Sequence, residues 1–480
     1  MKNKIDRRQF VRSTAALGAG LFVAPSALSA TLSAAKKADI NVAIIGAGAE
    51  GDELFKAVTK LGRNSGIKFR AVCDIWDYNR KKFASKLKKY GKYYGYDNRQ
   101  YVDYKDMLEK EKGKIDAVIV ASPDCFHAEH TNACLAAGLH VYCEKEMSNT
   151  IEGAKSMVIA ARESGKLLQI GHQRRSNPKY IFAKENIIDK KFSMKKGTLK
   201  STGPKDITVD SSLLGQITTI NGQWNRGAKA CRDLGWPTGT DIPKETLKKY
   251  GFKNMSQFRN WRWYKGLGGG PIVDLGSHQI DIYSWFLNEA KPKSVMASGG
   301  VDYWKGHEWY DNVMAIFEFD GPKGPVRAFY QTLTTSGSGG YFERFMGING
   351  TLEISEDPRF FKAGRQPKLL HDSSWEPWID SKLITKDPKP PKKKAGAVAD
   401  SRSSPPLIPY TVNSASIKDQ LKLPYHAPHL ANFFDAIRDK NVKLNCPAEV
   451  GYHTAVMVLK VNEAVKARKT LDFKPEDFHV

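Results

Sequence analysis

The chain of 480 residues has only six cysteines, and their spacing shows no repeated pairs. A disulfide framework or a zinc site requires cysteines or histidines at close, regular intervals. We therefore predict no metal ion, and we interpret most of the cysteines as buried free thiols. They are Cys73, Cys125, Cys134, Cys143, Cys231 and Cys446.

Long hydrophobic runs are also missing, since no stretch after residue 35 approaches the ~20 apolar residues that span a bilayer. We therefore expect no transmembrane segment. Arg7 and Arg8 form a twin-arginine pattern, followed by the apolar stretch 13–28 and small residues at 29–35. This order predicts a twin-arginine signal peptide over residues 1–35 and a periplasmic protein. A basic, disordered N-terminus is the alternative.

The net charge is +24, which by itself raises nucleic acid or an anionic membrane surface as partners. Much of this charge lies in three local runs, at 81–92, 184–200 and 382–394. Such runs are usually solvated helix faces or loops, and none coincides with a nucleic-acid motif. We predict no nucleic-acid partner.

The length and the 41% hydrophobic content predict two domains. Apolar β-branched runs alternate with helical patterns up to residue 171, which predicts an α/β Rossmann domain with a parallel sheet over residues 36–171. The expected strands are 40–45, 68–74, 115–121, 140–143 and 167–170, and the expected helices are 50–61, 126–137 and 151–164.

Residues 172–480 have a different pattern, in which strand candidates follow one another without regular helices between them. This predicts an α+β domain with a mainly antiparallel, open sheet. The expected strands are 217–224, 313–319, 326–331 and 351–355, and two helices, 429–438 and 449–467, end the chain. We interpret the Lys/Pro-rich insert at 371–404 as a long surface excursion.

A glycine-rich turn follows the first strand directly, with the sequence Gly46-Ala47-Gly48-Ala49-Glu50-Gly51. In this context Gly46 permits the turn, Gly48 lets the backbone approach a pyrophosphate, and Gly51 allows close helix packing. Asp74 ends the second strand, at the expected distance for a carboxylate that binds a ribose 2′-hydroxyl. We predict NAD in preference to NADP, although Arg80 could reach a 2′-phosphate.

Three polar residues suit the oxidation of an alcohol by hydride transfer, which requires a base close to the hydroxyl group. His278 can serve as that base. Asp274 lies four residues earlier, so on a helix its carboxylate could orient the imidazole. Lys145 follows a parallel strand and could stabilise the developing alkoxide. Each residue alone is more often a cap, a satisfied core partner or a surface charge.

Three segments resemble motifs of the Gfo/Idh/MocA family of sugar and polyol dehydrogenases. Glu144-Lys145-Glu146 resembles its Glu-Lys-Pro motif, residues 268–281 resemble its GGGxxxDxGxHxxD signature, and Ala121-Ser122-Pro123 with His127 resembles its strand end beside the nicotinamide. The resemblance implies catalytic roles for Lys145 and His278, supported by Asp274. It also places Ser122, Pro123, His127, Glu144 and Lys145 near the cofactor.

Glu146 departs from the family pattern, which has proline at this position. Proline would restrain the backbone of Lys145. The substitution could therefore loosen the lysine or add a carboxylate near the substrate.

Aromatic and hydrogen-bonding residues in the second domain suit the apolar faces and hydroxyl edges of a sugar. We predict that a carbohydrate or polyol substrate contacts Arg174, Trp224, Arg226, Trp261, Asp274 and His278. Each tryptophan could equally be a core residue. The family analogy also predicts a homo-oligomer formed through the open sheet.

The combined expectation is an NAD-dependent oxidoreductase that acts on a sugar, polyol or glycoside hydroxyl. Export would leave little free cofactor to exchange, so we expect NAD to be tightly bound. A redox-neutral glycosidase or epimerase that passes through a transient keto-sugar is the main alternative. A ligand-binding protein without activity is a third.

Overall fold

The computed structural model describes residues 36–94, 99–194, 209–356, 368–371, 375–386, 408–413, 415–417 and 419–480. The signal peptide predicted over residues 1–35 lies outside the described residues. Within the described part of the chain, no helix is both long enough and apolar enough to cross a bilayer.

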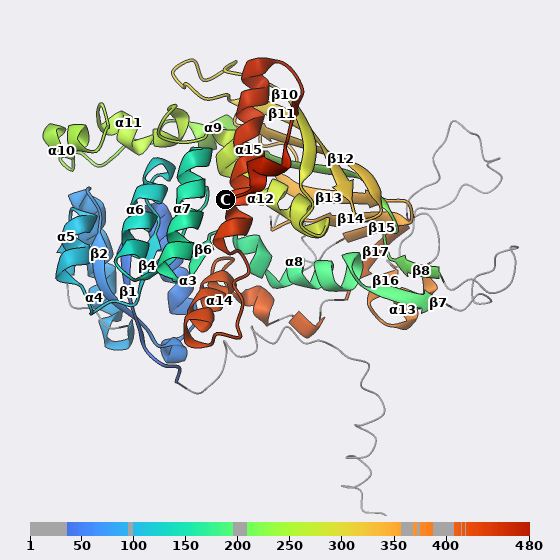
Figure 1. Ribbon diagram of the computed structural model, residues 1–480, viewed down its shortest axis with the longest axis horizontal. Helices are drawn as coiled ribbons and strands as arrows, with labels where there is room; N and C mark the ends of the chain where they lie inside the picture. The colour runs from blue at the N-terminus through green and yellow to red at the C-terminus, as the bar shows by residue number, and fades with distance from the viewer. Residues whose placement is uncertain are drawn as a thin grey trace, which may run out of the picture.

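The N-terminal unit is a six-stranded parallel sheet with helices on both faces, coloured blue to green in Figure 1. Its strand order, β3-β2-β1-β4-β5-β6, is that of a dinucleotide-binding sheet. The strands are β1 (Ile40–Ile45), β2 (Ile67–Cys73), β3 (Arg99–Tyr101), β4 (Ala117–Val120), β5 (His140–Cys143) and β6 (Leu168–Ile170). The helices are α3 (Ala49–Lys60), α4 (Asp77–Tyr94), α5 (Tyr104–Lys110), α6 (Asp124–Ala136) and α7 (Ile151–Ser164).

The predicted Rossmann fold is confirmed, and the strands that were expected agree with the observed ones to within three residues at either end. Sequence reasoning missed β3, which has three residues and no buried member. A strand this short and half-exposed has almost no hydrophobic pattern. It forms because its backbone pairs in parallel with the edge of β2.

The second sheet has ten strands in the order β16-β17-β15-β14-β13-β9-β12-β11-β10-β18. Among the strands that the structure describes in this sheet, only β9 and β12 pair in parallel, which confirms a mainly antiparallel sheet. Its strands are β9 (Ile217–Asn225), β10 (Pro292–Gly300), β11 (Asn312–Gly321), β12 (Gly324–Leu333), β13 (Tyr341–Gly347), β14 (Gly350–Ile354), β15 (Lys368–His371), β16 (Ile384–Lys386), β17 (Ile408–Val412) and β18 (Leu471–Asp472). A separate hairpin joins β7 (Lys191–Met194) to β8 (Val209–Ser212).

One face of this sheet is covered and the other is open. Helix α12 (Pro271–Phe286) packs on β9 and β12, where Tyr283 and Tyr330 are fully buried. Burial alternates along β11, so every second side chain faces away from this core. Met296, Met314 and Ile316 are exposed on β10 and β11, as expected for an open face.

The two closing helices connect the sheets. Helix α14 (Ala427–Arg438) packs on α3 and β5, and Lys37 pairs with Asp435 at 2.7 Å. Helix α15 (Ala448–Ala467) contacts α7 and β6 on one side and α12 and β10 on the other (Figure 1). The segment we assigned wholly to the second domain therefore returns to complete the core of the Rossmann unit.

Residues 228–264 of the second domain, called the excursion below, cross back over the Rossmann sheet. It contains the short helices α9 (Ala228–Cys231), α10 (Lys244–Lys249) and α11 (Met255–Arg259), while α8 (Pro178–Ala183) follows β6. Trp76, at the end of β2, packs in one apolar cluster with Ile242, Phe252 and Trp261. This contact holds the excursion over the carboxyl ends of the parallel strands.

The insert expected at 371–404 is described only in part. Helix α13 (Glu376–Asp380) and β16 lie beside β17, and Trp375 and Trp378 are buried. These residues extend the sheet and its core, instead of forming the surface excursion we expected. The remainder, residues 372–374 and 387–404, lies outside the described residues.

Candidate functional site

The glycine-rich turn joins β1 to α3 and tolerates no side chain at two positions. Gly46 has φ +94°, and a Cβ there would lie 2.4 Å from the carbonyl oxygen of Ala121. A Cβ on Gly51 would lie 2.2 Å from the carbonyl oxygen of Gly46. Both distances are shorter than any non-bonded contact, so the turn and the close helix approach depend on glycine.

The amino end of α3 offers unpaired donors to an anion. Among the described residues no side chain caps the helix, so backbone N–H groups of its first turn remain available. The direction in which Gly48 would carry a Cβ is open, with only Asn79 within 4 Å. The donors and the open approach fit the pyrophosphate of a dinucleotide.

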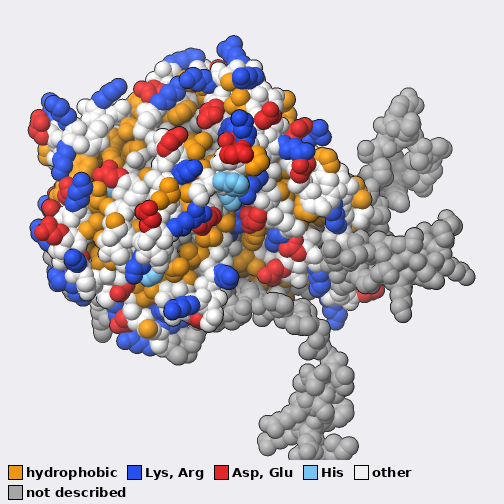
Figure 2. All heavy atoms as spheres, viewed as in Figure 1, with side chains coloured by type: hydrophobic (Ala, Val, Ile, Leu, Met, Phe, Trp, Pro, Cys, Tyr) orange, Lys and Arg blue, Asp and Glu red, His pale blue; other side chains and the backbone are white. Residues whose placement is uncertain are grey.

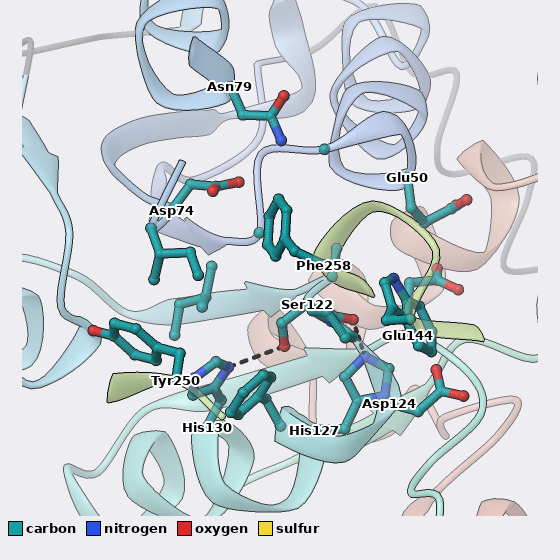
Figure 3. A pocket seen from close by; sticks show the side chains of 18 of the residues that line it. Glu50, Asp74, Asn79, Ser122, Asp124, His127, His130, Glu144, Tyr250 and Phe258 are labelled. Carbon is teal, nitrogen blue, oxygen red and sulfur yellow. Dashed lines mark hydrogen bonds between the residues drawn. The ribbon is translucent and has the colours of Figure 1, made fainter. Parts of the chain in front are cut away.

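Asp74 lies at the end of β2 and faces the same cavity (Figure 3). Its two carboxylate oxygens accept hydrogen bonds from the backbone N–H groups of Ala47 and Trp76, each at 2.8 Å. Arg80 donates to the carbonyl oxygen of Asp74 and pairs with Asp77. Among the residues that the structure describes, Asp74 is part of the cavity wall and Arg80 is not. Asp74 is therefore the better placed of the two to contact the ribose of a bound dinucleotide.

Ser122, Pro123 and His127 follow β4 and line this cavity. His127 is 1% exposed, and its ring nitrogens lie 2.7 Å from the carbonyl oxygen of Ser122 and 2.6 Å from that of Glu146. Burial lowers the pKa of His127 to about 4. Its ring therefore joins the ends of β4 and β5, and both nitrogens already face protein carbonyls.

The first cavity thus brings together nearly every predicted cofactor residue. Its wall contains Gly46, Gly48, Ala49, Glu50, Asp74, Ser122, Pro123, His127, Glu144 and Lys145, while Gly51 lies behind the turn. Figure 3 also shows Asn79, Asp124, His130, Tyr250 and Phe258, which we did not predict. Tyr250 and Phe258 come from the excursion, whose position over β2 no local pattern reveals.

A second cavity adjoins the first and contains the predicted catalytic residues. Lys145 Nζ lies 2.9 Å from Asp274 Oδ1 and donates to the carbonyl oxygen of Asp274 at 2.5 Å. Arg262 Nε lies 3.4 Å from the other carboxylate oxygen. Asp274 is therefore held between two cations at the boundary of the cavities.

Burial and charge act in opposition on this pair. Burial opposes the charged form of Lys145, but the Asp274 carboxylate outweighs it and raises the pKa of the lysine. Burial likewise opposes ionisation of Asp274, but Lys145, Arg262 and Arg226 hold its pKa well below the usual range. The pair is therefore charged throughout the neutral range.

His278 lies one turn after Asp274 on α12, as the spacing predicted. The structure does not support the hypothesis that Asp274 orients its ring, since no hydrogen bond joins the two among the described residues and Asp274 pairs with Lys145. The imidazole instead packs against Trp224, with 5.2 Å between ring centroids. Burial, reinforced by the charges of Lys145 and Arg174, lowers the pKa of His278 well below its ordinary value. The ring is therefore neutral and able to accept a proton.

Glu146 is fully buried and is not in the described wall of either cavity. Its Oε1 accepts a hydrogen bond from the backbone N–H of Met147, and the Lys145–Glu146 peptide is cis. Burial raises the pKa of Glu146 to about 8. Neither consequence we considered is observed, because the carboxylate points into the interior and Asp274 holds the lysine.

The predicted substrate residues occupy three different places. Trp224 and Arg226 line the second cavity, whereas Trp261 lines the first. Arg174 is 1% exposed and lies beneath the second cavity, where it pairs with Glu343 and with Glu356. Its guanidinium lies 5.5 Å from the Trp224 ring centroid, so it supports the tryptophan from behind.

Residues far along the chain complete the second cavity. They are Gln173, Arg232, Arg259, Arg262, Trp263, Tyr341, Glu356, Tyr425 and His426. Arg262 and Trp263 belong to the segment 260–264, whose aromatic and hydrogen-bonding composition suits a sugar, although we named only Trp261 from it. Tyr341, Tyr425 and His426 carry no such local pattern.

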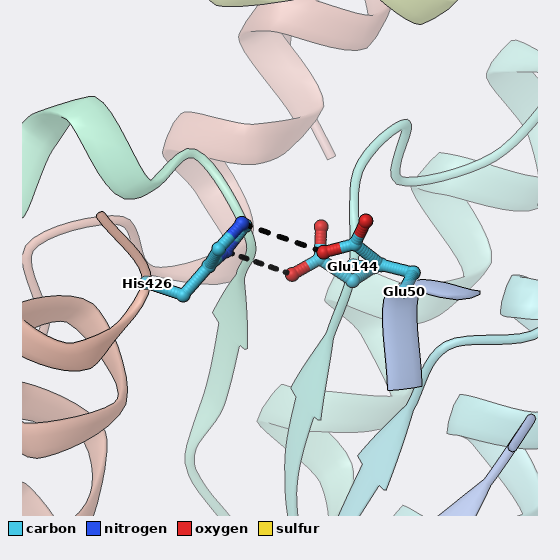
Figure 4. A group of neighbouring side chains, drawn as sticks. All are labelled: Glu50, Glu144 and His426. Atoms are coloured by element: carbon cyan, nitrogen blue, oxygen red, sulfur yellow. Dashed lines mark ion pairs between the residues drawn. The ribbon is translucent and has the colours of Figure 1, made fainter. Parts of the chain in front are cut away.

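Among the described residues, one group could offer three ligand atoms to a metal, namely Glu50, Glu144 and His426 (Figure 4). His426 Nε2 lies 3.4 Å from Glu50 Oε1, and Nδ1 lies 3.8 Å from Glu144 Oε1. Each ring nitrogen therefore faces a different carboxylate. This is the geometry of an imidazole that bridges two acids, and it links the start of α14 to the cofactor cavity.

Comparison with known proteins agrees with this arrangement. Residues 40–172 match the oxidoreductase family with an NAD-binding Rossmann fold, and residues 246–353 match the GFO/IDH/MocA C-terminal domain. The chain is 30% identical over 266 residues to D-glucoside 3-dehydrogenase of Escherichia coli (strain K12), a match that covers 55% of this chain and 59% of that protein. It is 29% identical over 268 residues to an NADP(+)-dependent scyllo-inositol 2-dehydrogenase of Bacillus subtilis (strain 168), covering 54% and 58%.

The chain thus spans less than two thirds of the length of either relative. Among solved structures, levoglucosan dehydrogenase in complex with NADH and L-sorbose superposes with a TM-score of 0.62 and 15% identity, covering 91% of this chain and all of that one. That likeness shows the fold. With both family domains matched, the chain belongs to the Gfo/Idh/MocA family of oxidoreductases and has its NAD-binding Rossmann domain.

Proposed function

We propose that this protein is an NAD-dependent oxidoreductase that acts on a hydroxyl-bearing carbon of a sugar, polyol or glycoside. The observation that carries the proposal is the position of Lys145, Asp274 and His278 in one cavity that adjoins the dinucleotide site. The relatives named above, a glucoside dehydrogenase and an inositol dehydrogenase, support a polyhydroxy substrate.

Each of the three residues has one task in this proposal. Lys145, held charged by Asp274, donates a hydrogen bond to the substrate oxygen and stabilises the alkoxide that develops there. His278 is neutral and accepts the hydroxyl proton. Bound NAD would supply the hydride acceptor. Trp224 stacks on Tyr341 with 4.3 Å between the ring centroids, and it offers a rigid surface for the apolar face of a sugar.

We further propose that the mature protein is exported through the twin-arginine route and retains its cofactor. Arg7, Arg8 and the apolar stretch after them support export. A cofactor that cannot be exchanged would have to be regenerated in the same site. The enzyme would then either reduce a second substrate or return the hydride within one turnover.

One experiment tests both the reaction and its balance. The mature protein is purified from periplasm without added cofactor, the nucleotide released by denaturation is identified, and the native protein is incubated with methyl glycosides and inositols. Bound NAD with keto-sugar and NADH supports the proposal. Cleaved or epimerised product without net NADH replaces it with the redox-neutral reaction. No bound nucleotide, and no product after NAD is added, refutes it.

We also propose that the open sheet face joins copies of this chain. Met296 is 48% exposed, Met314 45% and Ile316 39%, and β10 and β11 bring these side chains together on one face. A cluster of exposed apolar side chains is typical of a protein contact. Light scattering of the mature protein tests this, and a monomer at micromolar concentration contradicts it.

A further inference from the structure

The second cavity carries positive charge that its own acids do not neutralise. Its described wall contains the cations Lys145, Arg226, Arg232, Arg259 and Arg262, and the acids Glu50, Glu144, Asp274 and Glu356. The acids already have partners. Asp274 pairs with Lys145 and Arg262, Glu356 accepts from Arg174, and the other two face His426.

Two arginines carry the excess. Within the described part of the chain, Arg226 and Arg232 form no ion pair and no side-chain hydrogen bond, although both line the second cavity. Neither lies in the described wall of the first cavity, so the pyrophosphate of a dinucleotide does not account for them. Arg259 and Arg262, by contrast, line both cavities.

Arg226 is exposed in the wall of the second cavity, where its guanidinium can reach a ligand. Its backbone N–H donates to the carbonyl oxygen of Leu333 at 2.7 Å, at the end of β12. Its guanidinium lies 5.3 Å from the centroid of the Trp224 ring, on the tryptophan that packs against His278. Arg226 shares the wall of the second cavity with Asp274 and His278.

Resting on the proposed function, we propose that the substrate is a sugar or glycoside with an anionic substituent, bound by Arg226 and Arg232 while Trp224 packs against the ring. A guanidinium offers paired donors that match the oxygens of a carboxylate, sulfate or phosphate group. A cavity with low-dielectric walls also concentrates anions near its cations. Both arginines are exposed, so a neutral sugar would leave their guanidinium groups bound to water alone.

The test compares ligands that differ only in charge. D-glucuronate, D-glucose 6-phosphate and D-glucose are titrated into the NAD-loaded protein, and quenching of tryptophan fluorescence is followed, because Trp224 and Trp263 line the cavity. We expect at least one of the two anions to bind on the order of tenfold more tightly than glucose, the size of effect that charge-assisted hydrogen bonds produce. Comparison of the two anions distinguishes a carboxylate from a phosphate.

Variants assign the preference to these residues. R226Q/R232Q is expected to bring the ratio of anion to glucose affinity to within about twofold, since its charge-assisted bonds are lost. R327Q is the matched control, because Arg327 pairs with Glu318 at 2.9 Å on the sheet and lines neither described cavity wall. It should retain the preference of the unmodified protein.

The outcomes separate this inference from the function on which it rests. Equal affinity for glucose and both anions, no binding of any of them, or a preference that survives R226Q/R232Q overturns the inference. NADH formation from methyl glucoside without preference for methyl glucuronide also overturns it, while the proposed function stands. Preferential anion binding with no oxidised or otherwise converted sugar supports this site and refutes the oxidoreductase.

Discussion

Replacing Asp274 with asparagine removes the carboxylate that holds Lys145 charged and in place. The two side chains are 13% and 16% exposed and lie 2.9 Å apart, so water screens their attraction only weakly. The asparagine amide oxygen can still accept a hydrogen bond, and the backbone carbonyl of residue 274 still accepts from Nζ. The cost is therefore smaller than the ~3–5 kcal/mol of a fully buried pair that loses one partner.

The loss of one charge-assisted hydrogen bond is about 1.5–3 kcal/mol. At about 1.4 kcal/mol for each factor of ten, this predicts a fall in kcat/KM of roughly tenfold to a hundredfold. The pH dependence should change as well. Without the carboxylate, burial is the largest remaining influence and lowers the pKa of Lys145, while Asp124 and Arg262 act on it in opposite directions. Because the ammonium form donates the hydrogen bond, the alkaline limb of activity should move to lower pH in D274N.

Initial rates of NADH formation between pH 6 and 10.5 measure both effects, with the glycoside found active in the substrate panel. D320N is the matched control, because Asp320 also lies 2.9 Å from a lysine, Lys293, but both side chains are more than 60% exposed. An exposed pair of this kind contributes little. If D274N keeps kcat/KM within twofold and an unchanged alkaline limb, the proposed role of the ion pair is refuted.

Three further predictions concern other parts of the site. H278Q should lower kcat by about 10²–10⁴-fold at unchanged nucleotide content. Because the pKa of His278 is lowered, the acidic limb of activity in the unmodified enzyme should lie well below pH 6.5, and a limb centred near 6.5 would contradict this. R174M leaves Glu343 buried without its cation and should lower the free energy of unfolding, measured in urea, by ~3–5 kcal/mol. The control R344M breaks a partly exposed pair and should lower it by less than about 1 kcal/mol, so equal losses would refute the argument. D74S should weaken NADH binding by about tenfold and NADPH binding by less, as measured by nucleotide fluorescence. An unchanged ratio of NADH affinity to NADPH affinity would argue against ribose recognition by Asp74.

Local patterns were sufficient for the glycine-rich turn and for Asp74, although not for the rest of the cofactor cavity. The apolar run 40–45, the glycines after it and Asp74 all lie within one βαβ unit, and each acts through its own backbone or nearest strand. Such features depend on hydrophobic period and on steric limits, which are properties of short segments. The position of His278 one turn after Asp274 on a helix is predictable for the same reason.

The partners of charged side chains were not predictable in this way. Spacing suggested that Asp274 orients His278, but the folded chain pairs Asp274 with Lys145, which is 129 residues away. Arg174 resembled a substrate ligand, yet Glu343 and Glu356 arrive beneath the cavity and neutralise it there. An ion pair needs only proximity and opposite charge, and many pairings in one sequence satisfy that requirement.

The sequence by itself thus determined the Rossmann fold, the dinucleotide turn, the antiparallel character of the second domain and the identity of the catalytic candidates. Only the tertiary structure decided which residues share a cavity, including Tyr425 and His426 from the C-terminal region, and which arginines remain without an acidic partner. The physical reason is the distance along the chain over which each kind of interaction acts. Helix, strand and turn preferences act over a few residues, whereas the walls and charge balance of a cavity depend on segments brought together by the packing of two sheets and the helices between them.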